Sequence, residues 1–490
     1  MNRRLRIIAP LLPLTVWLMA GIASGYFFPQ PERAVLAAAV AVLAVGMVLT
    51  RFPRLQTVAI WMCTAIAGHW WAVHTVQQLR MPPRSHDLIV VSEPVSKGKT
   101  IVMDALTADG KKVRLRMMAE TQAVIGSGLT VSSDVQPIGY YPLYFDSHGY
   151  SGEVFAGYRQ WQGKQVSTDG LSYVQRARLR LLLYRKQLLE RYRLDGLNDE
   201  AFAVTAAMTL GDKSAISTQL RETFSITGAS HVLALSGLHL MIIYAVISLM
   251  VGWWRWRMVS QVATVLAVWA FAFLVGLSPS VVRSAFMISV YALASLGYRE
   301  RMSVNTLAFT AIVMLAVNPL AMYDISFQLS FMAVLWIVLL NPLLGSIIPL
   351  HVQQRHRWLS MLWGMTTVSV SAQVGTAPLV AYYFGRLPVY FLLSNYIVIP
   401  AATLILYLAL ASMMTGWWTA LQHILVGALA TIVSWMNGAL GWIAQLPKSS
   451  VEGLNLSTLQ VCLIYLLTGA LWVLLALATN RKNVEQLRES

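Results

Sequence analysis

Residues 228–283 decide the fold, because this nearly continuous apolar stretch carries polar groups where lipid would not tolerate them. It opens with Gly228-Ala-Ser-His231-Val-Leu-Ala-Leu-Ser236-Gly237-Leu-His239, continues as an apolar helix and turns at Arg255–Arg257. A second apolar helix ends at Gly276-Leu-Ser278-Pro279-Ser280, and a third begins with Arg283 near its entrance. Ionisable side chains at membrane depth mostly face the interior of a helix bundle or a water-filled path. The stretch is therefore a candidate pathway through a membrane.

The composition indicates an integral membrane protein. Of the 490 residues, 57% are hydrophobic and only 12% are charged, whereas a soluble domain carries about a quarter charged residues. The formal net charge is +16, which predicts an anionic partner such as phospholipid headgroups or nucleic acid. The two cysteines, Cys63 and Cys462, each lie in an apolar run, so we expect no disulfide framework, no metal site and no cofactor.

Apolar segments long enough to cross a bilayer recur along the chain, and basic residues fall at alternate joints between them. We read Met1–Phe28 as a retained first helix rather than a signal peptide, because further apolar segments follow it. The predicted helices are 7–28, 34–50, 55–76, 230–252, 258–276, 282–298, 303–317, 326–341, 358–383, 388–414, 418–445 and 457–479. The segment 418–445 contains polar residues and is either a full span or re-entrant. The basic flanks and joints are Arg3-Arg4-Leu-Arg6, Arg51–Arg54, Arg255–Arg257, Arg299–Arg301, Arg355–Arg357 and Arg481–Lys482. All of them fall on the cytoplasmic side if both termini are cytoplasmic.

Between residues 80 and 200 the hydropathy drops and short strands are predicted. They cover Leu88–Glu93, Thr100–Ala108, Lys112–Met118, Leu129–Val135 and Gly163–Ser167, with an Asp109-Gly110 hairpin signal between the second and third. Five short strands favour a small OB-like β-barrel, and a sandwich fragment is the alternative. This domain is expected on the external side of the membrane.

Two basic segments of this region are candidates for nucleic-acid binding. Lys111, Lys112, Arg114 and Arg116 lie in a strand where alternate side chains share a face, with Tyr140, Tyr141, Tyr144 and Trp161 near in sequence. The other reading of this strand is a solvated face over an aromatic core. Residues 172–193 predict a basic amphipathic helix, either lying on anionic headgroups or forming a basic collar that gathers a polyanion. Its candidate residues are Arg176, Arg178, Arg180, Arg185 and Lys186.

His231, Ser236 and His239 allow three interpretations. On one continuous helix the two histidines lie about 12 Å apart axially, so they do not jointly bind a metal. Ser236 and His239 are at i and i+3 and share a helix face, which permits an intramembrane serine hydrolase, although no partner carboxylate is evident. We favour a broken or closely packed helix at Ser236-Gly237.

Further polar groups recur inside the later apolar runs. Asp324 opens a helix as an N-cap and is expected near Arg283, which is either its ion-pair partner or a snorkelling arginine. Gln328 lies one turn deeper in the same helix. Gln373 and Asn395 are likewise polar residues inside apolar runs of later helices. The chain has no GxxxxGK[ST] phosphate-binding loop, so we expect the energy source to lie elsewhere.

Three ordered motifs resemble the ComEC-type competence DNA channels. They are Gly211-Asp212 ahead of Gly228–His239, Ser278-Pro-Ser-Val-Val-Arg283-Ser-Ala, and Asn318-Pro-Leu…Asp324-Ile-Ser-Phe-Gln328-Leu-Ser330-Phe. The resemblance covers roughly residues 200–415, with a weaker match at Phe145-Asp146 and Tyr150. It implies an inner-membrane channel for single-stranded DNA in natural transformation. The residues it places in the channel core, together with the polar positions noted above, are His231, Ser236, Gly237, His239, Arg283, Asp324, Gln328, Asp212, Gln373 and Asn395.

The resemblance also implies partners. They are single-stranded DNA, membrane lipids, a periplasmic DNA-delivery protein, and a cytoplasmic motor or single-strand-binding proteins. Many members carry a metallo-β-lactamase-like nuclease domain after the last helix. This sequence ends at Ser490 without a His-x-His-x-Asp-His cluster, so we expect no enzyme activity here. Either a separate nuclease degrades the other strand, or the channel receives strands that are already separated.

The sequence therefore predicts a polytopic α-helical membrane protein of about 11–12 transmembrane helices with an inserted external OB-like β-barrel. The expected parts are N-terminal helices 1–79, β-domain 80–170, basic helix 171–200, channel domain 201–480 and cytoplasmic tail 481–490. The alternatives are the Ser236/His239 hydrolase and a transporter of another polyanionic or lipid-linked substrate.

Overall fold

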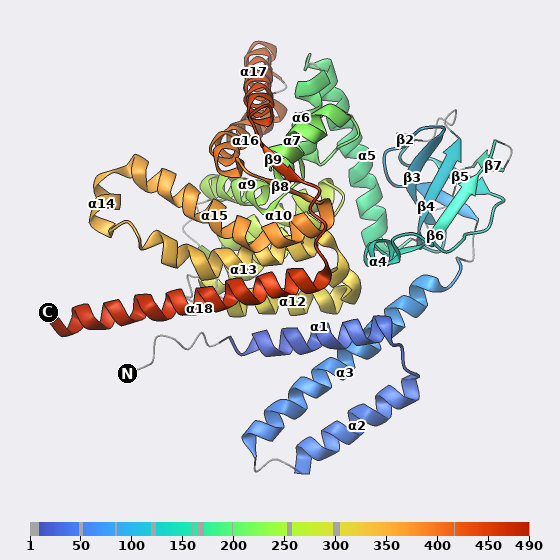
Figure 1. The fold of residues 1–490 in the computed structure, drawn as a ribbon. Helices are drawn as coiled ribbons and strands as arrows, with labels where there is room; N and C mark the ends of the chain where they lie inside the picture. The colour runs from blue at the N-terminus through green and yellow to red at the C-terminus, as the bar shows by residue number, and fades with distance from the viewer. Residues whose placement is uncertain are drawn as a thin grey trace. The chain divides into compact units, whose positions relative to one another are not determined.

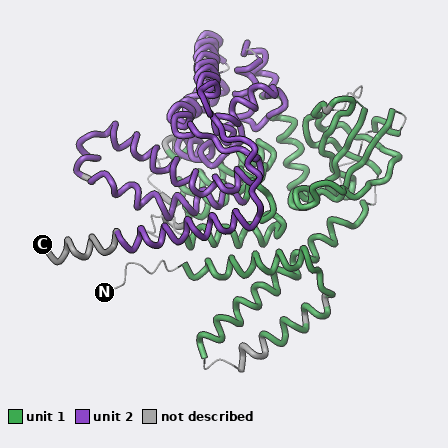
Figure 2. Tube along the Cα trace, viewed as in Figure 1, with its two compact units in different colours: residues 1–188, 247–327 green, residues 189–246, 328–490 purple. Residues whose placement is uncertain are grey.

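The chain divides into two compact units, each assembled from segments far apart in the sequence (Figure 2). Unit 1 comprises residues 1–188 and 247–327, and unit 2 comprises residues 189–246 and 328–490. The computed structural model describes residues 9–48, 52–83, 86–118, 124–158, 160–164, 166, 171–197, 199–251, 257–296, 304–415 and 417–489. The predicted basic residues Arg3, Arg4, Arg6, Arg51, Arg255, Arg299 and Arg301 lie outside these residues, as do Ser167 and Ser490.

Unit 1 contains the N-terminal helices and a second group of helices from the middle of the chain (Figure 1). The helices are α1 (Leu11–Phe27), α2 (Glu32–Val48), α3 (Pro53–Arg80), α10 (Arg257–Leu274), α11 (Pro279–Leu296), α12 (Val304–Val317) and the 3-10 turn η1 (Pro319–Tyr323). Each of the six α-helices overlaps a predicted apolar segment. Apolar periodicity and length are enough to locate them, because a membrane helix must satisfy all its backbone groups internally.

Glycines hold α1 and α3 close together. A Cβ atom on Gly21 or Gly25 would overlap the backbone carbonyl of Ala65 or His69, and one on Gly68 would lie 2.6 Å from the carbonyl oxygen of Leu18. Small residues four apart let membrane helices approach backbone to backbone, which replaces the hydrophobic driving force that lipid removes. The Gly21-x-x-x-Gly25 spacing on α1 therefore fixes this helix pair.

The β-domain of unit 1 is a mixed sheet of seven strands with one short helix (Figure 1). The elements are β1 (Asp87–Val90), β2 (Val95–Lys97), β3 (Thr100–Thr107), β4 (Lys112–Met118), β5 (Gly128–Val131), α4 (Pro142–Ser147), β6 (Tyr150–Ala156) and β7 (Trp161–Gly163). Strand order is β6-β4-β3-β1-β5-β7, with β2 paired to β3. Among the strand pairs of the described residues, β4–β6 is parallel and the others are antiparallel. Between the end strands β6 and β7 no pairing occurs among the described residues, so the sheet as described is open.

The predicted β3–β4 hairpin is confirmed, and other strand predictions need correction. Leu106 pairs with Lys112 across the turn, where Gly110 takes a φ of +81° that a side chain would resist. Of the fifth predicted strand, Gly163–Ser167, only Gly163 belongs to a strand among the described residues, as the last residue of β7. The predicted Leu129–Val135 strand ends at Val131, and the prediction missed β2, α4 and β6. The turn at Gly149 (φ +73°) and Gly152 within β6 weakened the strand pattern there.

Helix α5 (Tyr173–Leu194) packs its first half on the β-sheet. Leu179 and Leu182 join Ile89, Val91 and Leu106 in one buried cluster, and the Gln175 amide donates to the Gly110 carbonyl at 2.8 Å. The opposite face of the sheet carries the main apolar core of the domain, around Leu88, Leu115 and Val154. The interpretation of this helix as lying on headgroups is therefore wrong for the face with Leu179 and Leu182, which the sheet covers, while Leu183 is 40% exposed.

The described part of unit 2 is helical apart from one two-stranded antiparallel sheet, whose strands are separated in the sequence by two helices. Its elements are α6 (Asp199–Leu210), α7 (Thr218–Ile226), α8 (Ser230–Leu233), α14 (Leu350–Arg355), α15 (Arg357–Phe384), α16 (Phe391–Met414), α17 (Thr419–Ala444), α18 (Thr458–Glu489), β8 (Arg386–Pro388) and β9 (Ser450–Glu452). Helices α9 (Gly237–Val251) and α13 (Ile325–Gly345) run across the division between the units, as does α5. The prediction missed α6, whose residues from Ala201 to Leu210 are all buried, because the helix is short.

Four described helices are long and apolar enough to cross a membrane, and they make this a membrane protein by composition. They are Ile325–Gly345, Phe391–Met414, Thr419–Ala444 and Thr458–Ala478, with shorter apolar helices elsewhere. The segment predicted at 418–445 is one continuous helix, so the re-entrant alternative is wrong. Its polar residues do not interrupt it, because backbone hydrogen bonds within a helix do not depend on side-chain polarity.

Candidate functional site

The basic strand β4 alternates as predicted, but its cations are held by carboxylates. Val113, Leu115 and Met117 are buried on one side, and Lys112, Arg114 and Arg116 are half-buried on the other. Lys112 Nζ lies 3.0 Å from Asp104 Oδ2, while Arg116 Nη2 lies 3.0 Å and Arg114 Nε 3.9 Å from Glu153 Oε1. The face is therefore not a free basic surface, and water reaches it only in part: the Lys112 and Arg114 side chains are 21% and 15% exposed, and that of Arg116 is 37% exposed. The face is an ion-pair network, and DNA contact by these residues stays a prediction.

Aromatic rings complete this network. Lys112 Nζ lies 3.9 Å from the centre of the Tyr150 ring, and Arg114 lies over Phe145 at 5.1 Å. The Tyr150 hydroxyl donates to Asp104 at 2.7 Å. Burial lowers the pKa of Lys112 from its usual range, with the Asp104 charge opposing the shift. Burial and the Asp104 charge together raise the pKa of the Tyr150 hydroxyl.

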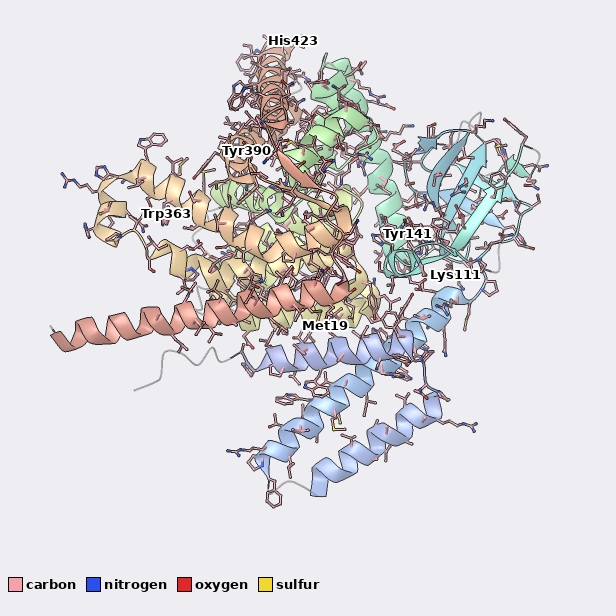
Figure 3. All side chains as sticks on the ribbon, in the orientation of Figure 1. Met19, Lys111, Tyr141, Trp363, Tyr390 and His423 are labelled. Atoms are coloured by element: carbon pink, nitrogen blue, oxygen red, sulfur yellow. The ribbon has the colours of Figure 1, made fainter. Side chains whose placement is uncertain are left out.

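Helix α4 attaches the β-domain to the helices of unit 1. The Tyr26 hydroxyl of α1 donates to Asp146 at 2.9 Å, and the Asn318 amide donates to the Ser147 carbonyl at 3.0 Å. Tyr141, at the start of α4, has a φ of +49° and a side chain that is 78% exposed (Figure 3). A non-glycine residue in that region is strained. Lys111, also labelled in Figure 3, donates to the Met81 carbonyl at 2.7 Å, just beyond α3.

The basic residues of α5 differ in exposure, so they do not form one uniform collar. Arg176, Arg178, Arg185 and Lys186 are half-buried, and Arg180 is exposed. Arg176 lies over the Tyr173 ring at 4.8 Å. Burial lowers the pKa of Arg178, with Asp104 opposing the shift. The Asp104 charge therefore acts on both candidate basic segments, through its ion pair with Lys112 and at longer range on Arg178.

The predicted break at Ser236-Gly237 is confirmed, because α8 ends at Leu233 and α9 begins at Gly237. His239 is fully buried, and its Nδ1 accepts the Ser236 backbone N–H at 3.2 Å. Ser236 Oγ lies 2.9 Å from the same nitrogen, and Nε2 has no hydrogen-bond partner among the described atoms. His231 is exposed and contacts the Gly228 carbonyl at 3.0 Å through Nδ1.

The predicted Arg283–Asp324 pair is present within unit 1. Arg283 Nη1 lies 3.9 Å from Asp324 Oδ2, and the residues are 3% and 7% exposed. Asp324 Oδ1 accepts the Ser326 N–H at 2.8 Å, which confirms the predicted N-cap. The snorkelling alternative does not fit a side chain buried to this degree.

Three of the four remaining candidates from the sequence, Asp212, Gln328 and Asn395, form hydrogen bonds inside unit 2. Asp212 accepts the Ser214 N–H and hydroxyl at 3.0 Å each, and so shapes the turn after α6. The Tyr383 hydroxyl donates to Gln328 Oε1 at 2.7 Å, and Asn395 donates to Ser369 Oγ at 3.1 Å. Gln373 is half-buried on α15. Helix packing accounts for the polarity of Gln328 and Asn395.

One ion-pair centre was not predicted from the sequence. Arg386 bonds Glu222 at 2.7 Å and Glu452 at 2.9 Å and so joins α7, β8 and β9. No periodic signal marks Arg386, because its ion pairs join segments that are far apart in the sequence. Ser278, which the sequence analysis placed in a motif without giving it a role, has a buried Oγ with no partner among the described atoms. Among the described residues, no three His, Cys, Asp or Glu side chains group to hold a metal ion.

Comparison with known proteins supports the resemblance. The chain is 24% identical over 339 residues to "ComE operon protein 3" of Bacillus subtilis (strain 168), covering 67% of this chain and 41% of that protein. It is 30% identical over 217 residues to an "Uncharacterized protein" of Aquifex aeolicus (strain VF5), covering 43% of this chain and 47% of that protein. The chain thus spans less than half the length of these curated relatives. No solved structure matches it. The model of the family described as Competence protein matches residues 208–478, more than half of the chain, and the chain belongs to that family.

Proposed function

We propose that this protein carries single-stranded DNA across the bacterial inner membrane during natural transformation. The observation that carries the proposal is the competence-family match over residues 208–478, which include the spans of unit 2 and the polar groups of α9, α11 and α13. Phosphates cross a bilayer only where polar groups replace their water. The proposed path residues are Asp212, His231, Ser236, Gly237, His239, Arg283, Asp324, Gln328, Gln373 and Asn395.

The β-domain and α5 are proposed as the external entrance. Antiparallel pairing of β3 with β1 and β4, the parallel β4–β6 pair and the β1–β5 pair support the OB-like assignment. In this proposal both chain ends lie in the cytoplasm and residues 80–200 lie outside, an orientation that the basic residues at alternate joints of the sequence support. The roughly 11–12 spans, a delivery protein outside the membrane, a cytoplasmic motor and a separate nuclease belong to the same proposal.

The serine-hydrolase alternative retains one favourable observation, the 2.9 Å contact between Ser236 Oγ and His239 Nδ1. A hydrolase of this kind also needs a group that orients the base. His239 Nε2 has no such partner among the described atoms. The same Nδ1 accepts the Ser236 backbone N–H, so the imidazole caps the start of α9. This capping role accounts for the contact between Ser236 and His239 without requiring a catalytic function for the two residues.

Uptake of fluorescent duplex DNA in a deletion strain tests the proposal. We expect DNA foci to persist outside the inner membrane with no chromosomal integration, and both the wild-type gene and Ser236→Ala to restore integration. Ser236→Ala keeps the backbone N–H that His239 accepts, so the helix start survives. Normal integration in the deletion strain would refute the transport proposal, and loss of all activity in a well-folded Ser236→Ala protein would favour the hydrolase.

A further inference from the structure

Arg283 is a buried cation whose hydrogen-bonding capacity is largely unused. Its side chain is 3% exposed, and neither Nε nor Nη1 has a hydrogen-bond partner among the described atoms. A guanidinium group carries five N–H donors, and leaving buried donors unpaired costs free energy. A buried arginine with unpaired N–H groups is expected where a bound ligand, rather than the protein, supplies the hydrogen-bond acceptors.

Asp324 does not supply them. The 3.9 Å separation between Arg283 Nη1 and Asp324 Oδ2 exceeds a hydrogen bond. The other carboxylate oxygen, Oδ1, is committed to the Ser326 N–H at the start of α13. Asp324 therefore balances the charge of Arg283 without a hydrogen bond, and the Nε and Nη1 donors of Arg283 stay available to another anion.

Other donors gather at the same end of α11. Side chains on a helix generally lean towards its N-terminus, and Arg283 lies on the second turn of α11, five residues after Ser278. The first backbone N–H groups of a helix carry a partial positive charge and have no intrahelical acceptor. In α11, Pro279 has no N–H and the Val282 N–H donates to the Ser278 carbonyl at 3.0 Å, so this role falls to the N–H groups of Ser280 and Val281. Ser278, immediately before the helix, has a buried Oγ without a partner among the described atoms. The turn ahead of it is tied to α10, because Gly276 and Leu277 donate to the Phe273 and Ala272 carbonyls.

We propose that the N-terminus of α11, with Arg283 and Ser278, binds one phosphodiester group of the moving strand at a time. This proposal rests on the transport function proposed above. It adds that the bound group is a phosphodiester and that Asp324 competes with this group for Arg283. Arginine suits a phosphate because two N–H groups match two oxygens. Asp324 keeps the site reversible by competing for Arg283, since transport requires binding strong enough to admit a phosphate and weak enough to release it.

The test measures binding of a fluorescent single-stranded oligonucleotide to the full-length protein in lipid nanodiscs over a range of salt concentrations. Arg283→Gln should weaken binding about tenfold and make the slope of log K against log salt shallower by about 0.7, one phosphate contact on a single strand. Asp324→Asn should strengthen binding, because asparagine still caps α13 while the competing charge is gone. An oligonucleotide with an uncharged methylphosphonate backbone should not distinguish wild type from Arg283→Gln.

The double variant Arg283→Gln/Asp324→Asn guards against misfolding, because it removes both charges and leaves no unpaired buried ion. The double variant should unfold at a temperature close to that of wild type. Its slope of log K against log salt should still be shallower than that of wild type by about 0.7. If wild type binds but Arg283→Gln keeps its slope, or Asp324→Asn weakens binding as Arg283→Gln does, the pair is structural and the phosphate site is refuted. If wild type does not bind the oligonucleotide and the deletion strain integrates DNA normally, the transport proposal itself is refuted.

Discussion

Replacing Glu153 with glutamine tests whether the basic face of β4 meets DNA. Glu153 Oε1 lies 3.0 Å from Arg116 and 3.9 Å from Arg114, and Oε2 accepts the Tyr140 hydroxyl at 3.0 Å. Glutamine has the same shape and still offers an oxygen to Tyr140. The substitution therefore removes one negative charge that faces two guanidinium groups, and little else.

Two opposing effects follow from this geometry. The Arg116 side chain is 37% exposed, so water screens its pair with Glu153, and we expect the free energy of unfolding to fall by only about 1 kcal/mol. The released guanidinium groups gain about one phosphate contact, which steepens the salt slope by about 0.7 on a single strand. Over a fourfold rise in salt, the variant should then lose roughly 2–3-fold more affinity than wild type does.

Binding of a single-stranded oligonucleotide to the full-length protein at two salt concentrations measures this difference. Glu452→Gln is the matched control, because Glu452 also pairs with an arginine, Arg386 at 2.9 Å, outside the β-domain. The variant Glu153→Gln should bind more tightly at low salt, and Glu452→Gln should not. Equal changes in both variants would mean that total charge, not the β4 face, controls binding, and no change in either would remove β4 from the DNA path.

Two further predictions concern stability. Gly21→Val should lower the temperature at which α1 and α3 separate, because a Cβ at this position would overlap the Ala65 carbonyl. The expected loss in the free energy of unfolding is about 1–3 kcal/mol. In the same thermal-unfolding assay in detergent, the control Gly427→Val should have no such effect, because no atom lies within 4 Å of a Cβ at that position. For Tyr150, burial and the Asp104 charge hold the folded-state pKa above its ordinary value of 10.0, so its stabilisation is complete below pH 10 and is lost as the pH rises beyond that value. Denaturant unfolding at pH 8 and pH 11 should therefore show a larger loss in wild type than in Tyr150→Phe, and equal losses would contradict this assignment.

Local signals in the sequence located most elements but not their partners. The alternation of β4 and the Asp109-Gly110 turn are properties of neighbouring residues, and both predictions hold. Glu153, which neutralises Arg114 and Arg116, lies on a parallel strand about forty residues further along the chain. Parallel pairing leaves no short-range signal, because a long crossover separates the two strands.

Helix α5 shows the same limit for amphipathic patterns. The leucine spacing correctly indicated a helix with one apolar face. Periodicity does not tell whether lipid or a β-sheet covers that face, since both are apolar. Contacts of Leu179 and Leu182 with Ile89 and Leu106 decide it in favour of the sheet.

Hydrogen-bond satisfaction separates the polar residues singled out from the sequence into two groups. Gln328, Asn395 and Asp212 bond within the chain, and these bonds explain why they are tolerated among apolar side chains. Arg283 and His239 are as deeply buried but keep unpaired nitrogen donors among the described atoms. An unpaired buried donor costs about 1–3 kcal/mol, so such donors are not needed to hold the helices together. Binding of a passing ligand would account for this cost. The buried polar groups without a partner in the fold, rather than those already bonded, are therefore the ones that we expect a charged strand to contact.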